Sequence, residues 1–137
     1  MKLTILDASV AIKFFIVEES GAKSAAAVLD EIKNQPEKFA VPELFFCEML
    51  SVLCRLTRDA RHVREYMDAL QDLGLERVGH GRVLLGHAAK LACRYRLRGY
   101  DAIYLATAEL CGGTWLTADH KAARQLHSNR HVRLLGP

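Results

Sequence analysis

Short apolar segments alternate with helical segments along the whole chain of 137 residues. Five segments rich in apolar or branched residues predict strands, at 2–6, 39–41, 75–78, 114–117 and 131–135. Helix-like patterns lie between them, as the crossovers between parallel strands require. The alternation predicts an α/β fold with a mainly parallel sheet of about five strands, formed by one domain over residues 1–137.

Three aspartates stand where a helix is expected to begin. Asp7 and Asp119 directly follow predicted strands, and Asp101 opens the helix after Gly99. Each has an ordinary structural explanation, because an aspartate before a helix accepts hydrogen bonds from free backbone N–H groups. However, the carboxyl ends of parallel strands lie along one edge of a sheet, where ligands bind. We therefore expect these carboxylates to meet there.

A fourth acid, Glu48, belongs to a helix that is expected to start with Pro42 in its first turn. This helix carries a stripe at helical spacing that is expected to face the core: Phe45, Met49, Val52 and Leu56. Glu48 lies on the flank of the stripe, where an unpaired charge is costly to bury. An ion, an arginine partner and contact with solvent all remain open for this carboxylate.

Four carboxylates in one crevice repel one another, and a divalent cation removes that repulsion. Oxygen ligands without sulfur or paired histidine favour Mg²⁺ or Mn²⁺ over zinc. Ser9 and Thr117 are expected to orient the ligands through hydrogen bonds.

Composition limits the remaining possibilities. No apolar run reaches the length of a membrane span and no secretory signal opens the chain, so a cytoplasmic protein without membrane contact is expected. The four cysteines lack metal-binding or redox spacing and are expected to be buried, reduced thiols: Cys47, Cys54, Cys93 and Cys111. Residues 51–100 are rich in arginine, which is compatible with a polyanionic ligand or with solvated helix faces.

Four sequence blocks together resemble the PIN-domain ribonucleases, specifically the VapC-type toxins of toxin–antitoxin pairs. The first block is LDASVAIKFF at 6–15, and the second is Pro42-Glu43-Leu44 followed by Glu48. The third is YDAIYLA at 100–106, and the fourth is LTAD at 116–119. The blocks follow the order of that family and span nearly the whole chain. One departure is Ser51, where such toxins often carry asparagine.

This resemblance implies a three-layer α/β/α fold and a catalytic, metal-binding set of acids: Asp7, Glu48, Asp101 and Asp119. It further implies an endoribonuclease that depends on Mg²⁺ or Mn²⁺ and hydrolyses RNA phosphodiester bonds. The implied partners are RNA, a cognate antitoxin and a second copy of the chain in a homodimer.

Several basic residues lie close to the acids in sequence. We expect RNA backbone contacts from some of Lys13, Arg94, Arg96 and Arg98, because phosphate neutralisation dominates nonspecific affinity. Cations at a helix end that favour its dipole are the equal alternative. A further group could serve RNA, a dimer partner or an antitoxin, and the sequence does not choose for Arg55, Arg58, Arg61 and Arg64.

Two other functions remain open from the sequence. A phosphorelay receiver has a similar length, an α/β sheet and clustered acids, but it needs an acceptor aspartate at the end of a strand where this chain has Glu48 within a helix. A catalytically inactive PIN-like protein that only binds a partner is the second alternative, since a fold does not establish an activity.

Overall fold

The computed structural model describes residues 2–16 and 20–137. Its sheet has the order β3-β2-β1-β4-β5, and every pair of neighbours is parallel. The strands of the described part are β1 (Thr4–Leu6), β2 (Phe39–Pro42), β3 (Glu76–Val78), β4 (Thr114–Thr117) and β5 (Val132–Leu134). The predicted parallel sheet is confirmed.

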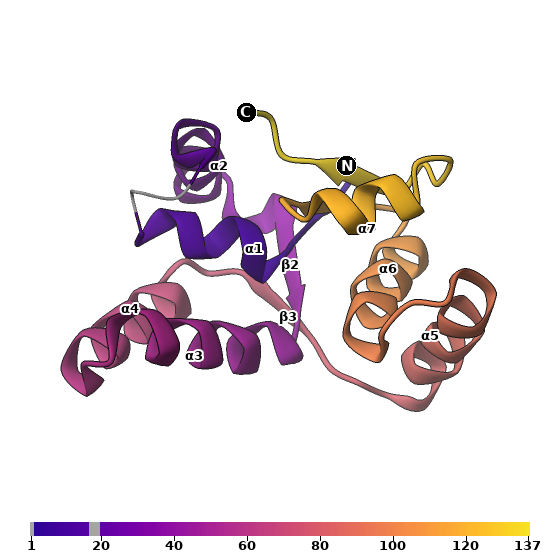
Figure 1. Cartoon of the computed structure of the whole chain (residues 1–137), viewed down its shortest axis with the longest axis horizontal. Helices are drawn as coiled ribbons and strands as arrows, with labels where there is room; N and C mark the ends of the chain where they lie inside the picture. Colours follow the sequence, from indigo (N-terminus) through magenta and orange to yellow (C-terminus); the bar gives the residue numbers. More distant parts are fainter. Residues whose placement is uncertain (1, 17–19) are drawn as a thin grey trace.

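Helices connect the strands and cover the sheet in a three-layer α/β/α arrangement (Figure 1). The chain between β1 and β3 contains α1 (Ala8–Ala11), the 3₁₀ turn η1 (Ile12–Phe14), α2 (Ala22–Asn34), the 3₁₀ turn η2 (Pro36–Lys38), α3 (Leu44–Thr57) and α4 (Ala60–Asp72). The remainder contains α5 (Arg82–Tyr95), α6 (Gly99–Cys111) and α7 (His120–Gln125). No helix of the described residues combines the length and the apolar character needed to cross a membrane.

The strand order reverses its direction at the centre of the sheet. From β1 the chain proceeds through β2 to β3, and it then crosses to β4 on the other side of β1. Such a reversal leaves a crevice at the carboxyl ends of the two central strands. Leu6 pairs with Leu116 at this end, and the N–H of Asp7 donates to the carbonyl of Leu116 at 3.1 Å. The residues after β1 and β4 are therefore neighbours.

Helix α3 begins later than the sequence predicts. Pro42 is the last residue of β2, where it pairs with Val78, and α3 starts at Leu44. The ladder continues past the proline because the N–H of Glu43 donates to the carbonyl of Val78 at 2.9 Å. Proline is tolerated at such a strand end because its missing donor is replaced by the next residue.

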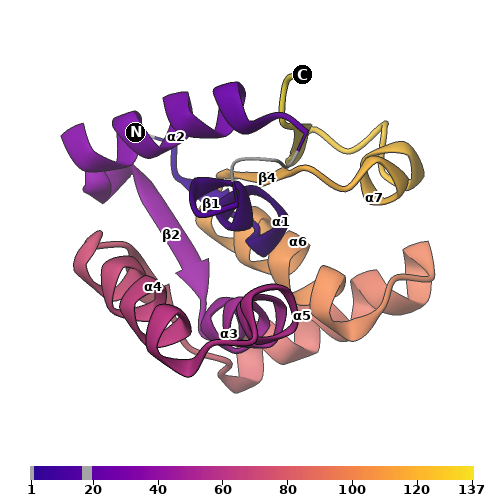
Figure 2. The same ribbon diagram turned by 60° about the vertical axis from the view of Figure 1, so that its left-hand side comes forward.

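The core stripe of α3 is also shifted by one residue from the prediction. Phe45, Met49 and Leu53 are fully buried, whereas Leu56 is 46% exposed and Val52 is half-buried. The shift turns Val52 and Leu56 toward the edge of the sheet where β1 ends. Figure 2 shows α1 close to α3 at this edge.

The predicted burial of the four cysteines is wrong. Each thiol is free, and each of the four residues is exposed. Cys47 and Cys54 lie two turns apart on α3, as their spacing predicts, but on a side of the helix away from the buried stripe. The seven-residue spacing of two side chains shows that they share a helix face, but it does not show whether that face is buried.

Candidate active site

The four acids predicted from the sequence line one cavity of about 370 Å³ at the carboxyl end of the central strands. Asp7 and Asp119 come from the residues after β1 and β4, Glu48 from α3 and Asp101 from α6. The rest of the wall is made by Ala8, Ser9, Ile12, Lys13, Val52, Arg55, Leu56, Arg98 and Ala118. Residues distant in sequence thus share one polar crevice.

Asp7 is buried and held by two donors. Its Oδ2 accepts the N–H of Ser9 at 2.9 Å, which caps α1, and its Oδ1 accepts Nε1–H of Trp115 at 2.9 Å. Burial raises the pKa of Asp7; the hydrogen bonds from Ser9 and Trp115 oppose this shift, and the charge of Asp119 adds to it. The carboxylate is therefore fixed in place at an electrostatic cost.

Asp119 caps α7, with Oδ1 accepting the N–H groups of Lys121 at 2.9 Å and Ala122 at 3.3 Å. The backbone around it is held by two hydroxyl groups. Thr117 Oγ1 accepts the N–H of Asp119 at 3.0 Å, and Ser9 Oγ accepts the N–H of Ala118 at 2.9 Å. The two hydroxyls are 3.3 Å apart. Ser9 and Thr117 thus position the main chain that carries the acids.

Glu48 is partly buried and accepts the hydroxyl of Tyr104 through Oε1 at 2.7 Å. Burial raises the pKa of Glu48, the hydrogen bond from Tyr104 lowers it, and the nearby acids raise it again. Burial, reinforced by the charges of Asp7 and Glu48, raises the pKa of Tyr104 well above its usual range, so its phenol stays protonated and donates. Tyr104 is not among the site residues predicted from the sequence. Its position three residues after Asp101, on the same helix face, was the available signal.

Asp101 does not cap its helix. Helix α6 begins at Gly99 behind Arg98, and no side chain caps it. Burial raises the pKa of Asp101; the charge of Arg98 lowers it, and Asp7 and Asp119 raise it. Arg98 Nε lies 3.7 Å from Oδ2, and its side chain is mostly exposed. No backbone N–H at the start of α6 is capped by this carboxylate, so the capping explanation fails for Asp101.

The donor chemistry of this cavity fits a hard divalent cation. Mutual repulsion contributes to the raised pKa of Asp7, Glu48 and Asp101, and a cation offsets that repulsion. No three histidine, cysteine or acidic side chains in residues 2–16 and 20–137 are arranged to hold one ion by themselves. Mg²⁺ suits such a site because it usually retains several waters and binds through few carboxylates together with substrate phosphate.

A second cavity of about 340 Å³ adjoins the acids and is basic. It shares Asp101 and Asp119 with the first cavity and is lined by Arg96, Arg98 and Lys121. Arg96 follows the last residue of α5 in a left-handed conformation with φ of 55°. Lys121, which follows Asp119 by two residues, is not among the RNA contacts predicted from the sequence.

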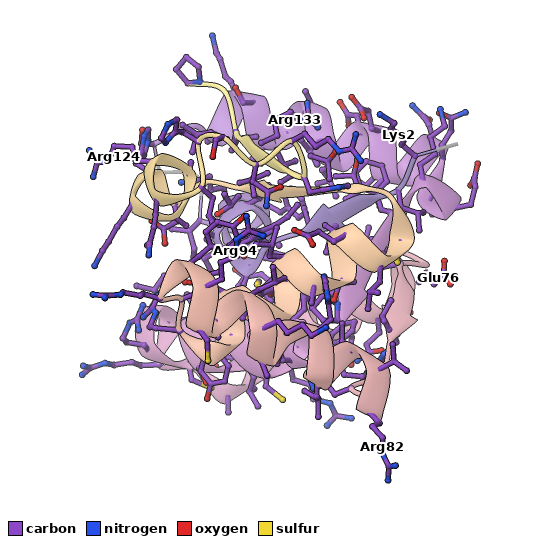
Figure 3. The ribbon with its side chains drawn as sticks, turned by 90° about the vertical axis from the view of Figure 1, so that its right-hand side faces the viewer. Lys2, Glu76, Arg82, Arg94, Arg124 and Arg133 are labelled. Atoms are coloured by element: carbon purple, nitrogen blue, oxygen red, sulfur yellow. The ribbon has the colours of Figure 1, made fainter. Side chains whose placement is uncertain are left out.

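The other predicted RNA contacts divide into two groups. Lys13 and Arg98 line the acidic cavity, whereas Arg94 lies over the ring of Tyr95 at 5.1 Å and lines neither cavity. Of the arginines at 55, 58, 61 and 64, Arg55 lines the acidic cavity. Other basic side chains lie elsewhere: Arg82 and Arg124 point outward at separate edges in Figure 3, and Arg133 is exposed on β5. Positive charge is thus distributed around the molecule as well as beside the acids.

Comparison with known proteins identifies the family. The sequence profile of the PIN domain matches residues 4–125, so the chain belongs to the PIN domain family. No curated protein matches its sequence. A toxin–antitoxin complex from Klebsiella pneumoniae contains a similar chain, with a TM-score of 0.72 and 18% identity over 95% of each chain. A crystal structure of a protein from Pyrobaculum aerophilum has a TM-score of 0.74 and 19% identity, covering 98% of this chain and 90% of that one.

Proposed function

We propose that this PIN-domain protein is an endoribonuclease that hydrolyses RNA phosphodiester bonds with Mg²⁺ or Mn²⁺ and acts as the toxin of a toxin–antitoxin pair. The observation that carries the proposal is the convergence of Asp7, Glu48, Asp101 and Asp119 on one cavity that adjoins a basic one. Acids to hold a cation beside cations to hold a polyanion are the two requirements of metal-assisted phosphodiester hydrolysis.

In this proposal the side chains bind the cation, accept a proton or bind phosphate. Asp7, Asp101 and Asp119 would hold the cation, directly or through water, and it supplies a water of lowered pKa and charge for the scissile phosphate. Glu48 serves as a further ligand or as the base that accepts the proton of the attacking water. Tyr104 keeps Glu48 in one orientation by donating to Oε1. Arg96, Arg98 and Lys121 bind flanking phosphates.

The toxin role includes an antitoxin, a homodimer and a cytoplasmic location. It is supported by the four sequence blocks and by the similarity to a chain of the Klebsiella pneumoniae toxin–antitoxin complex. Co-expression with a short DNA-binding protein encoded next to this chain tests it. Rescue of growth and a stable complex of the two are expected; growth arrest that no neighbouring protein relieves would contradict the role.

The decisive test replaces Asp101 with asparagine, which keeps the shape of the side chain and removes its charge. RNA cleavage in Mn²⁺ is expected to fall by at least about a hundredfold, because the cation loses a ligand. Metal binding has its own readout, since Trp115 is the only tryptophan of the chain and donates to Asp7. Mn²⁺ should change its fluorescence in the unmodified protein and do so more weakly in Asp101→Asn. Undiminished cleavage in the variant would refute the site.

The same measurements separate the alternatives. A catalytically inactive PIN-like binding protein would neither cleave RNA nor show metal-dependent fluorescence. A phosphorelay receiver would be labelled by acetyl phosphate, and the family match together with the position of Glu48 within α3 favours the nuclease over that function.

A further inference from the structure

A third cavity, of about 630 Å³, also adjoins the acids. Its lining is mainly apolar, in contrast to that of the basic cavity. It lies between α3 and the start of α6 and shares Glu48 and Val52 with the acidic cavity. Its other lining residues are Glu43, Leu44, Cys47, Ser51, His80, Tyr100 and Ile103. The shared residues make it continuous with the candidate active site.

The chemistry of this cavity rejects phosphate. No lysine or arginine among residues 2–16 and 20–137 lines it, whereas the carboxylate of Glu48 does. Glu43 also lines it, with its carboxylate paired with Arg77, whose Nε lies 2.6 Å from Oε2. Most of its surface is apolar side chain, from residues such as Leu44, Val52 and Ile103. A neutral, flat group suits these walls better than a backbone phosphate, which suits the cavity with Arg96 and Lys121.

The aromatic ring of Tyr100 lines this cavity and does not pack into the protein core. Tyr100 is 63% exposed, next to Asp101, and no other residue of 2–16 and 20–137 makes a hydrogen bond or a ring contact with its side chain. Exposed aromatic rings beside a nucleic-acid path serve as stacking platforms for unpaired bases, because every base has a π-face.

Polar groups accompany the ring. His80 Nε2 accepts the N–H of Leu44 at 3.3 Å, so the neutral imidazole carries its proton on Nδ1 as a donor. The Ser51 hydroxyl, which also lines the cavity, makes no hydrogen bond to another described residue. Both side chains can bond the edge of a base.

We propose that this cavity is a base-binding subsite, in which Tyr100 stacks on an unpaired RNA base beside the scissile phosphate and Ser51 and His80 contact its edge. The inference rests on the proposed ribonuclease function and adds which part of the substrate lies on this side of the acids. The RNA backbone would then run from the basic cavity across the acids, with one base turned into the apolar cavity.

The test combines a protein change with a substrate change. Single-stranded RNA oligonucleotides carrying one abasic nucleotide at successive positions around the cleavage site are cut by the unmodified protein and by Tyr100→Ala. The abasic site is expected to lower kcat/KM about tenfold at one position next to the cleaved bond, and Tyr100→Ala should lower it similarly on the intact RNA. The two changes together should cost little more than either alone, because both remove the same stacking.

Two variants control for structure. Tyr100→Phe keeps the ring and should restore the dependence on the base. Val83→Ala removes an exposed apolar side chain outside all three cavities and should behave like the unmodified protein. Effects of Tyr100→Ala and of the abasic site that multiply, or an abasic scan without a sensitive position, would overturn the subsite.

The outcomes also separate this inference from the proposed function. A protein that cuts no RNA in Mn²⁺ refutes the ribonuclease, and the same oligonucleotides then serve in binding titrations. Equal affinity for intact and abasic RNA in those titrations overturns the subsite as well. If Tyr100→Ala instead changes only the oligomeric state measured by light scattering, the cavity is a protein interface and the base is excluded from it.

Discussion

Asp7 and Asp101 carry the same charge at the same cavity, but they serve the fold differently. The carboxylate of Asp7 satisfies Ser9 N–H and Trp115 Nε1–H, whereas that of Asp101 caps nothing and faces an exposed Arg98 at 3.7 Å. The pKa of both acids is raised, first by burial. Asp7 is therefore needed for structure as well as for the proposed chemistry, and Asp101 for the chemistry alone.

Stability measurements without metal should show this difference. Asp101→Asn is expected to keep or raise Tm, because it removes a repelled, partly buried charge. Asp7→Asn offers one acceptor oxygen to two donors and should destabilise by about 1–3 kcal/mol. Thermal unfolding in EDTA checks both variants, and a larger loss for Asp101→Asn than for Asp7→Asn would contradict the assignment.

The pH dependence of stability follows from the same raised pKa values. An acid whose pKa is higher in the folded than in the unfolded state takes up its proton first in the folded state, so folding is favoured as pH falls through the folded pKa. The metal-free protein should therefore gain stability from these acids on mild acidification from neutral pH. Denaturant unfolding at several pH values should show a smaller gain for Asp101→Asn, with Arg82→Gln as the control.

We expect Tyr104 to act as a positioning residue through Glu48, to which its hydroxyl donates. Tyr104→Phe keeps the buried ring, which is stacked 5.7 Å from Trp115, and removes only the donor to Oε1. We expect RNA cleavage to fall about tenfold through kcat, because the proposed base loses its fixed orientation. A change in KM alone, or unchanged cleavage, would contradict this role; the fluorescence of Trp115 reports whether the core is preserved.

At the scale of elements, the approach of β4 to β1 fixes how near their carboxyl ends lie. Gly113 precedes β4, and a Cβ atom there would collide with the backbone carbonyl of Leu3. The N–H of Thr114 donates to that same carbonyl at 3.0 Å. The pairing that places Asp7 and Asp119 together thus depends on a position without a side chain.

Gly113→Ala should therefore disturb the site from a distance. The free energy of unfolding, measured by denaturant titration, is expected to fall by about 2 kcal/mol or more, because β1 and β4 must separate. The variant should also bind Mn²⁺ more weakly. Gly86→Ala is a matched control, since a Cβ at Gly86 meets no atom within 4 Å. Equal stability of the two variants would show that the strands can adjust without cost.

At the scale of the whole molecule, the net charge of +3 is too small to account for selective RNA binding. For the proposed RNA binding, the local arrangement is expected to decide: Arg96, Arg98 and Lys121 share a cavity adjoining the acids, and Lys13 and Arg55 line the acidic cavity itself. Affinity for RNA should depend on these few positions and on salt.

Removing two of these cations should lower the salt dependence of binding. Arg96→Gln with Lys121→Gln is expected to reduce the slope of log K against log salt by about 0.7 per lost phosphate contact. Single-stranded RNA is titrated with the Asp101→Asn protein to prevent cleavage. Arg82→Gln with Arg133→Gln makes the same change of net charge at exposed positions and should leave the slope nearly unaltered. Equal slopes for the two double variants would exclude a local phosphate site.

The sequence by itself predicted the parallel strands and the four acids that line one cavity. Alternating apolar and helical segments predicted the parallel strands, because each short strand is buried and each crossover needs a helix. The aspartates at 7 and 119 could be placed because the carboxyl ends of parallel strands share one edge.

Only the tertiary structure decided which side of each helix is buried and what lies beside the acids. The seven-residue spacing of Cys47 and Cys54 could not show that their face is exposed, and the pattern around Leu56 missed the burial of Leu53. Tyr104 and Lys121 belong to the site because α6 and α7 pack beside the acids. The physical reason is that local periodicity records a preference for burial, whereas contacts between distant segments depend on the packing of all layers together.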